Sequence, residues 1–209
     1  MTALLLTEYI GIASAALSGY LYGVKKECDL LGIFMAAFLT ALSGGILRDA
    51  LVGRDIYSFT HYMPISIVLA VILFAMAFKI HTKRESLDKS TLFVMSDAID
   101  IVSFSIVGSM VALEYGYNIF GVLLIALANG VGGGIFRDML YNEVPWFMKT
   151  GFYGTVCIVT GLIYYFMDLV GLNNMFFIMI LFAFGVAFRM IAHKKNWRLP
   201  KIEEEKWAI

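Results

Sequence analysis

The chain of 209 residues is too apolar for a water-soluble domain of its length, with 60% hydrophobic and only 15% charged residues. Soluble domains are about 45–50% apolar and about 25% charged, because most of their surface stays hydrated. The formal net charge is zero, so no basic excess points to a nucleic-acid partner. The composition predicts an integral membrane protein.

Seven apolar segments follow one another, each long enough to cross a hydrocarbon core of about 30 Å. Short polar segments such as Lys25-Lys26-Glu27 separate them. The segments lie at about 3–24, 30–52, 62–80, 91–113, 117–140, 147–167 and 172–192. We predict one all-α transmembrane domain over residues 1–195 and a polar cytoplasmic tail over 196–209.

Basic residues gather on one side of the predicted membrane. The opposite side holds little more than Arg54. By the positive-inside rule the N-terminus is outside and the C-terminus cytoplasmic. The residues that set this orientation are Lys25, Lys26, Lys79, Lys83, Arg84, Lys89, Lys149, Arg189, Lys194, Lys195, Arg198, Lys201 and Lys206.

The first and fourth segments carry acidic residues. Glu8 lies in the first, and Asp97 and Asp100 share one face of the fourth because they are three residues apart. Acids buried in membrane helices are functional candidates, and along an aqueous route they would favour cations. The alternative is that they sit at helix ends, in the membrane interface.

The second and fifth segments share a motif. Ser43-Gly44-Gly45-Ile46-Leu47-Arg48-Asp49 matches Gly132-Gly133-Gly134-Ile135-Phe136-Arg137-Asp138 at an offset of 89 residues. The same offset pairs Glu8 with Asp97 and Gly19 with Gly108. A constant offset across two helices indicates an internal duplication.

The duplication predicts two repeats of three helices, over about 3–80 and about 91–167, with a seventh helix at about 172–192 outside them. Because three is odd, the second repeat enters the membrane from the opposite side. This gives inverted repeats related by a pseudo-two-fold axis in the membrane plane.

The glycine runs predict a kink or local unwinding in the second and fifth helices, because each glycine weakens a helix by about 1 kcal/mol relative to alanine. Freed carbonyl oxygens could then replace the water around a cation, with Ser43 and Asn129 as further oxygen ligands. The alternative is tight packing of straight helices. The glycines concerned are Gly44, Gly45, Gly132, Gly133 and Gly134.

An arginine–aspartate pair follows each run, Arg48-Asp49 and Arg137-Asp138. Charges at a membrane-helix centre cost about 2.5–3.5 kcal/mol each, so they normally face a protein interior or water. Adjacent helical residues do not face one another. We therefore predict cross-repeat pairs, Arg48 with Asp138 and Arg137 with Asp49, with snorkelling to the interface as the alternative.

No pattern indicates an enzyme, a resident metal or a cofactor. The three histidines have no metal-ligand spacing, and no Ser/His/Asp set stands out. Cys28 and Cys157 lie in or beside apolar segments and are expected to act as small hydrophobic residues.

The doubled Gly-Gly-x-x-Arg-Asp motif, in two three-helix repeats with a seventh helix, resembles the prokaryotic TRIC proteins, relatives of the trimeric intracellular cation channels of animals. The resemblance covers the chain to about residue 195. It implies a homotrimer in a prokaryotic cell membrane (the inner membrane in a Gram-negative organism), with potassium and other monovalent cations passing through each subunit between kinked second and fifth helices. Phosphoinositide binding does not carry over, because Asn142-Glu143-Val144 lacks the lysine of the animal motif.

Some bacterial proteins with this domain are described as glycine transporters, so a secondary transporter of a small zwitterion is the alternative function. A membrane scaffold is disfavoured, because intramembrane Arg–Asp pairs recur at matching repeat positions.

Overall fold

The computed structural model describes residues 2–80, 90–149 and 152–199, and within them every regular element is an α-helix. Lys83, Arg84, Lys89 and most of the predicted tail lie outside the described residues. The helices are α1 Thr2–Lys25, α2 Leu30–Val52, α3 Tyr57–Thr60, α4 Met63–Ala77, α5 Thr91–Glu114, α6 Ile119–Leu140, α7 Trp146–Lys149, α8 Tyr153–Leu169 and α9 Met175–Lys194.

Polar side chains begin the long helices at equivalent places in the two halves. The side chain of Asp29 accepts a hydrogen bond from the Gly32 N–H at 2.8 Å, and Asn118 accepts one from the Gly121 N–H at 3.1 Å. These caps satisfy N–H groups that lack a partner in the first turn. Because Asn118 follows Asp29 by 89 residues, α2 and α6 begin at equivalent positions.

Five helices are long and apolar enough to cross a membrane: α1, α2, α5, α6 and α9. The 15 residues of α4 and 17 of α8 span only about 22 and 25 Å at 1.5 Å per residue. The all-helical prediction is confirmed, whereas the seven crossings and their orientation stay predictions. The predicted segment at 147–167 is two helices, α7 and α8, separated by a left-handed Phe152.

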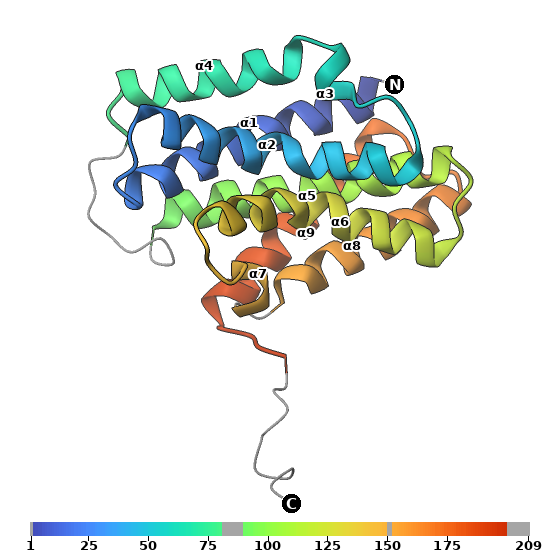
Figure 1. The fold of residues 1–209 in the computed structure, drawn as a ribbon. Coiled ribbons are helices and arrows are strands. Elements are labelled where there is room, and N and C mark those ends of the chain that lie inside the picture. The colour runs from blue at the N-terminus through green and yellow to red at the C-terminus, as the bar shows by residue number, and fades with distance from the viewer. Residues whose placement is uncertain (1, 81–89, 150–151, 200–209) are drawn as a thin grey trace, which may run out of the picture.

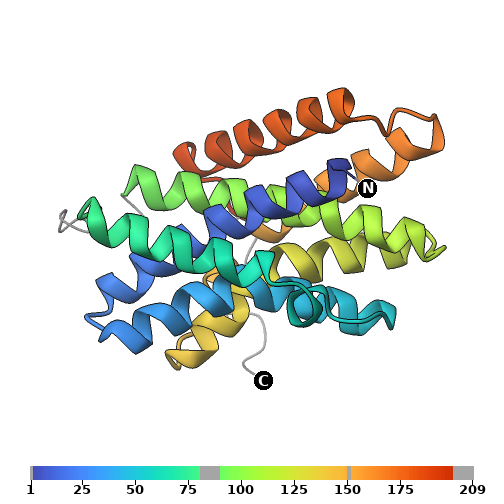
Figure 2. The ribbon, with the colours of Figure 1, turned by 90° about the horizontal axis from the view of Figure 1, so that it is seen from above.

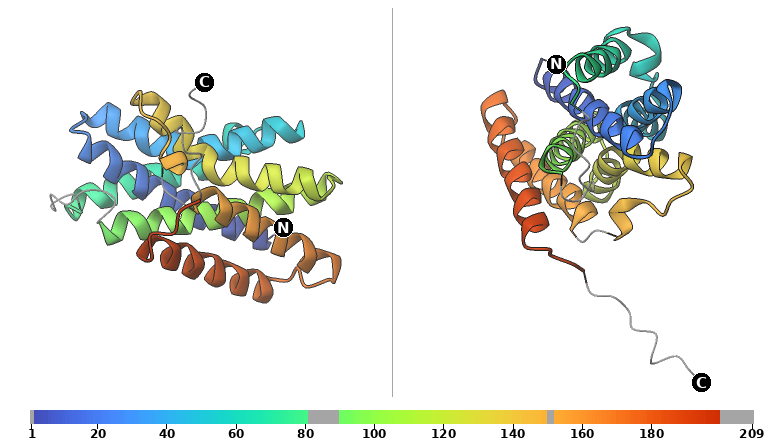
Figure 3. Two further views of the ribbon diagram at one scale, coloured as in Figure 1. Left: turned by 90° about the horizontal axis from the view of Figure 1, so that it is seen from below. Right: turned by 90° about the vertical axis from the view of Figure 1, so that its left-hand side faces the viewer.

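The two halves run in opposite directions. In Figure 1, α1 runs away from the N label while α5 runs back towards that end. One hydrophobic cluster lies mainly within α1, α2 and α4, and a second lies within α5, α6, α8 and α9. The end-on view in Figure 3 places α5 at the centre of the bundle. This agrees with the burial of most of its residues.

Large apolar side chains are exposed on the outer helices. α9 lies along one edge of the bundle in Figure 2, and α4 lies on another side in Figure 3. Such surfaces suit lipid chains rather than water. The exposed large apolar residues of α4 are Met63, Leu69, Leu73, Phe74 and Met76, and those of α9 are Phe176, Met179, Ile180, Phe184 and Ile191.

Candidate functional site

The glycine runs bring α2 and α6 into backbone contact instead of interrupting them. Both helices are continuous through the runs, so the predicted local unwinding is wrong, whereas the kink predicted as its alternative stays a prediction. A methyl group on Gly44 would overlap the Asn129 carbonyl oxygen, and one on Gly133 would overlap the Thr40 carbonyl oxygen. Asn129 and Thr40 are themselves 89 residues apart. The contact is therefore symmetric, and the close approach of two backbones outweighs the low helix propensity of glycine.

The second glycine of each motif lies beside the guanidinium of the arginine three residues later, and a methyl group there would make only an ordinary contact. A Cβ on Gly45 would lie 3.7 Å from Arg48 Nη2, and a Cβ on Gly134 would lie 3.8 Å from Arg137 Nη2. Each guanidinium therefore folds back over its own helix. The motif thus combines a glycine at the helix crossing with a glycine that lies beside a buried arginine.

Arg48 is fully buried and pairs within its own repeat. Its Nε donates to Asp49 Oδ1 at 2.7 Å, and its Nη2 donates to Glu8 Oε1 of α1 at 2.9 Å. Arg54 also donates to Asp49 Oδ1, at 2.8 Å. Two cations and two carboxylates are thereby brought together between α1, α2 and the connection to α3.

Arg137 occupies the equivalent place in the second repeat. Its Nε donates to Asp138 Oδ1 at 2.9 Å. Its guanidinium lies over the ring of Tyr22, with the central carbon 4.1 Å from the ring centroid. In this repeat an aromatic face from α1 replaces one carboxylate contact, because ring faces carry partial negative charge.

The predicted cross-repeat pairs are wrong. Arg48 bonds Asp49 and Arg137 bonds Asp138, although each pair is adjacent in sequence. The rule that neighbours diverge describes where the Cβ atoms point, and the long arginine side chain reaches around that divergence. Both arginines are buried, so snorkelling does not occur either.

Each aspartate also holds the start of a short helix. Asp49 Oδ2 accepts from the Tyr57 N–H at 2.9 Å, and Asp138 Oδ2 accepts from the Trp146 N–H at 2.6 Å. Each donor lies eight residues after its acceptor, at the beginning of α3 or α7. The Arg–Asp motif therefore connects the helix crossing to the turns that follow it.

Asp97 belongs to a third buried charge group. Tyr153 donates to Asp97 Oδ1 at 2.7 Å, and Arg189 Nη2 lies 3.8 Å from Asp97 Oδ2. Asp100 is also buried, one turn later in α5. The sequence interpretation missed the role of Arg189: it was counted with the basic residues that set the orientation, yet it lies inside α9 and is 1% exposed. Its position within the last apolar segment was the available signal.

We expect Tyr153→Phe to destabilise the protein by about 1–2 kcal/mol, because it leaves a buried carboxylate without its hydroxyl donor. The measurement is thermal unfolding of the purified protein in detergent. Tyr165→Phe, on the same helix but only half-buried, is the matched control. Equal melting temperatures for both variants would contradict a role for the Tyr153 hydroxyl.

Ser43 and Asn129 do not flank an unwound segment. The Ser43 hydroxyl donates to the Leu39 carbonyl within α2, and Asn129 Nδ2 donates to the Phe104 carbonyl at 2.6 Å. Asn129 Oδ1 has no hydrogen-bond partner among the described residues. Gly132 lies against Gly44, with 3.1 Å between its added Cβ and the Gly44 Cα.

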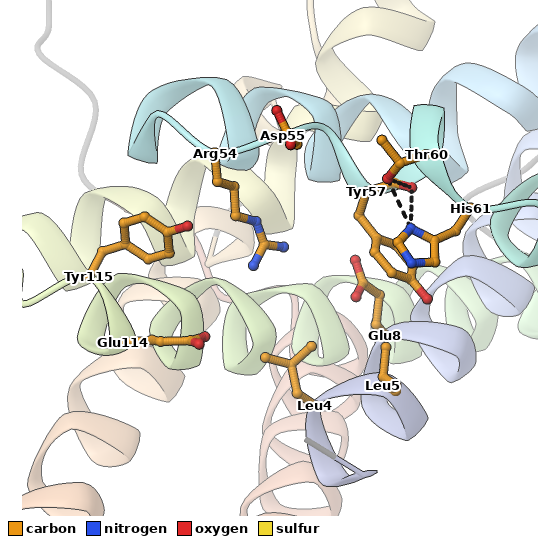
Figure 4. Close-up of a pocket in the computed structure, with 10 residues that line it drawn as sticks. All are labelled: Leu4, Leu5, Glu8, Arg54, Asp55, Tyr57, Thr60, His61, Glu114 and Tyr115. Atoms are coloured by element: carbon orange, nitrogen blue, oxygen red, sulfur yellow. Dashed lines mark hydrogen bonds between the residues drawn. The ribbon is translucent and has the colours of Figure 1, made fainter.

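A pocket of about 740 Å³ opens beside α3 (Figure 4). Its walls come from the start of α1, the α2–α3 connection, α3 and the end of α5. Tyr57 bonds Tyr9 at 2.7 Å between hydroxyl oxygens, and burial together with this bond raises the pKa of Tyr57, which stays neutral. The lining residues are Leu4, Leu5, Glu8, Arg54, Asp55, Tyr57, Thr60, His61, Glu114 and Tyr115.

A family profile described as "Glycine transporter" matches residues 5–80 and 94–168. The two matched stretches begin 89 residues apart (94 − 5), the offset found in the sequence. The UPF0126 membrane protein YvgT of Bacillus subtilis is 31% identical over 198 residues, which cover 93% of this chain and 94% of that protein. The chain belongs to this family of multi-pass membrane proteins.

Solved structures of TRIC channels are similar to this chain. A chain from a study of conductance through TRIC cation channels superposes with a TM-score of 0.82 at 30% identity, covering 95% of this chain and 96% of that one. A prokaryotic TRIC channel gives 0.84 at 28% identity, covering 94% and 98%. The resemblance to prokaryotic TRIC proteins inferred from the motifs is confirmed.

Proposed function

We propose that the protein is a homotrimeric cation channel that conducts potassium and other monovalent cations through each subunit. The observation that carries this proposal is the similarity to TRIC cation channels over more than nine-tenths of both chains. No chemistry beyond binding and passage is required, so we infer that the protein is not an enzyme.

The charges support a route for cations that begins at the pocket. Glu8, Asp55 and Glu114 line it with Arg54, and Glu8 Oε2 has no hydrogen-bond partner among the described residues. The proposed route continues between α2 and α6. Because Gly44 and Gly133 leave no room even for a methyl group, we propose that α2 and α6 move apart when the channel conducts.

Potassium flux from liposomes tests the proposal. Purified protein in potassium-loaded vesicles is expected to release potassium down its gradient without glycine on either side, and sodium more slowly. The controls are empty liposomes and vesicles that carry Gly133→Ala, a variant expected to be destabilised. Absence of flux from folded, correctly reconstituted protein would contradict the channel.

The second candidate is a secondary transporter of a small zwitterion such as glycine. It is favoured by the description of the family profile and by a pocket with both a guanidinium and carboxylates, which could hold a carboxylate and an ammonium group. Saturable glycine uptake without potassium conductance would establish it in place of the channel.

A further inference from the structure

The pocket beside α3 is larger than a monovalent metal cation requires. Its volume of about 740 Å³ lies within the range of about 300–1,000 Å³ that is typical of sites for small organic molecules. A water molecule occupies only about 30 Å³ in the liquid, so a single potassium ion would leave most of the pocket to solvent. The pocket therefore has room for an organic ligand.

The repeat does not require this cavity. The offset of 89 residues carries Leu4 and Leu5, on the pocket wall, to Phe93 and Val94 at the start of α5. Phe93 is 0% exposed and Val94 2% exposed, and Phe93 stacks on Trp146 with 5.1 Å between ring centroids. Side chains thus fill the equivalent place in the second repeat. The hollow beside α3 is therefore a specific feature of the first repeat.

The charges on the pocket wall favour a cation. Arg54 pairs with Asp49, so its positive charge is already balanced. Asp55 and Glu114 are exposed on the wall, and neither forms an ion pair with another described residue. The pocket therefore carries an excess of negative charge.

Glu8 presents a buried acceptor to the pocket. The residue is 4% exposed and lies on the pocket wall (Figure 4). Its Oε1 accepts from Arg48 Nη2 at 2.9 Å, whereas its Oε2 has no hydrogen-bond partner among the described residues. A buried polar atom without a partner costs about 1–3 kcal/mol. A ligand that donates a hydrogen bond to Oε2 would remove that cost.

The wall next to Glu8 is apolar. Leu4 and Leu5 lie on the preceding turn of α1, are half-buried and line the pocket (Figure 4). Apolar side chains are stabilised by contact with other apolar groups, because that contact removes both surfaces from water. A charged acceptor beside an apolar wall thus suits a ligand with a donating cationic end and an alkyl body.

We propose that the pocket binds a primary alkylammonium ion, whose ammonium group donates to Glu8 Oε2 and whose alkyl chain lies against Leu4 and Leu5. A primary ammonium group has three N–H donors and one positive charge. It therefore satisfies Oε2, and the carboxylates of Asp55 and Glu114 attract it at longer range. The site rests on the proposed function only in lying at the start of the proposed cation route.

Two isomeric cations test the hydrogen bond. Butylammonium and tetramethylammonium have the same composition and charge, but only butylammonium donates N–H groups. Their dissociation constants are measured from the rise in melting temperature of the detergent-purified full chain at constant ionic strength. We expect butylammonium to bind at least about tenfold more tightly, the effect of one charge-assisted hydrogen bond. Equal dissociation constants would overturn the proposal.

Leu5→Trp tests where the ion binds, because it fills the pocket without changing a charge. We expect the affinity for butylammonium to fall at least about tenfold, since the alkyl chain loses its place on the wall. Leu6→Trp is the matched control. It adds the same side chain at the next position of α1, where Leu6 is exposed and does not line the pocket, so the affinity should not change. Equal affinities in the two variants would contradict binding in this pocket.

Glu8→Gln tests the acceptor itself. Arg48 would take the amide oxygen and leave the amide NH₂ group towards the pocket, so the two isomers should bind within about threefold of each other. A tenfold preference that survives in folded Glu8→Gln would overturn the proposal, and Leu5→Trp decides if this variant does not fold. Binding is measured without flux. Butylammonium binding to protein that releases no potassium would therefore support the site and count only against the channel.

Discussion

Gly133→Ala is expected to lower the melting temperature by about 6–12 °C, a loss of about 3 kcal/mol for a chain of this size. The added methyl group would overlap the Thr40 carbonyl oxygen of α2. A backbone carbonyl in a continuous helix cannot rotate away, so α2 and α6 would have to move apart. The measurement is thermal unfolding in detergent, followed by size-exclusion chromatography.

Gly134→Ala is the control within the same glycine run. Its added carbon would lie 3.8 Å from Arg137 Nη2, an ordinary contact, while the alanine favours the helix by up to about 1 kcal/mol. We expect an unchanged or slightly higher melting temperature. If both alanine variants were equally destabilised, the crossing at Gly133 would not be the reason for the glycine.

Arg48→Met is expected to cost about 3–5 kcal/mol, because it leaves the buried Glu8 and Asp49 carboxylates with too little positive charge. Adding Glu8→Gln should recover part of that loss, because it removes the carboxylate that Arg48 Nη2 had bonded. We expect a coupling energy of about 1–3 kcal/mol between the two positions, measured by a double-mutant cycle of thermal unfolding.

The control cycle combines Arg48→Met with Asp138→Asn in place of Glu8→Gln. The cross-repeat pairing predicted from sequence would make Asp138 the partner of Arg48. The contacts of Asp138 are with Arg137 and Trp146. Its coupling to Arg48→Met should therefore be within about 0.5 kcal/mol of zero. A larger coupling to Asp138 than to Glu8 would restore the cross-repeat pairing and contradict the contacts described above.

The chain revealed its membrane class, its repeat and its motif residues through one-dimensional patterns. The length of an apolar segment indicates whether a helix lies in lipid or in water. The constant offset of 89 residues between the repeats can be read from the sequence whatever the packing. For that reason Arg48, Arg137, Glu8 and Asp97 stand out in the sequence alone. Arg189 was missed because no repeat position marks it.

The roles of those residues depended on distances between segments remote in sequence. Glycine weakens an isolated helix, so the runs predicted a break; only the contact of Gly44 and Gly133 with carbonyls of the facing helix shows why both helices stay intact. The charge partners were likewise decided by how far an arginine side chain reaches within a packed repeat. The sequence alone shows that the two halves are equivalent. The pocket beside α3 and the buried cluster of Tyr22, Phe93 and Val94 are properties of tertiary packing alone.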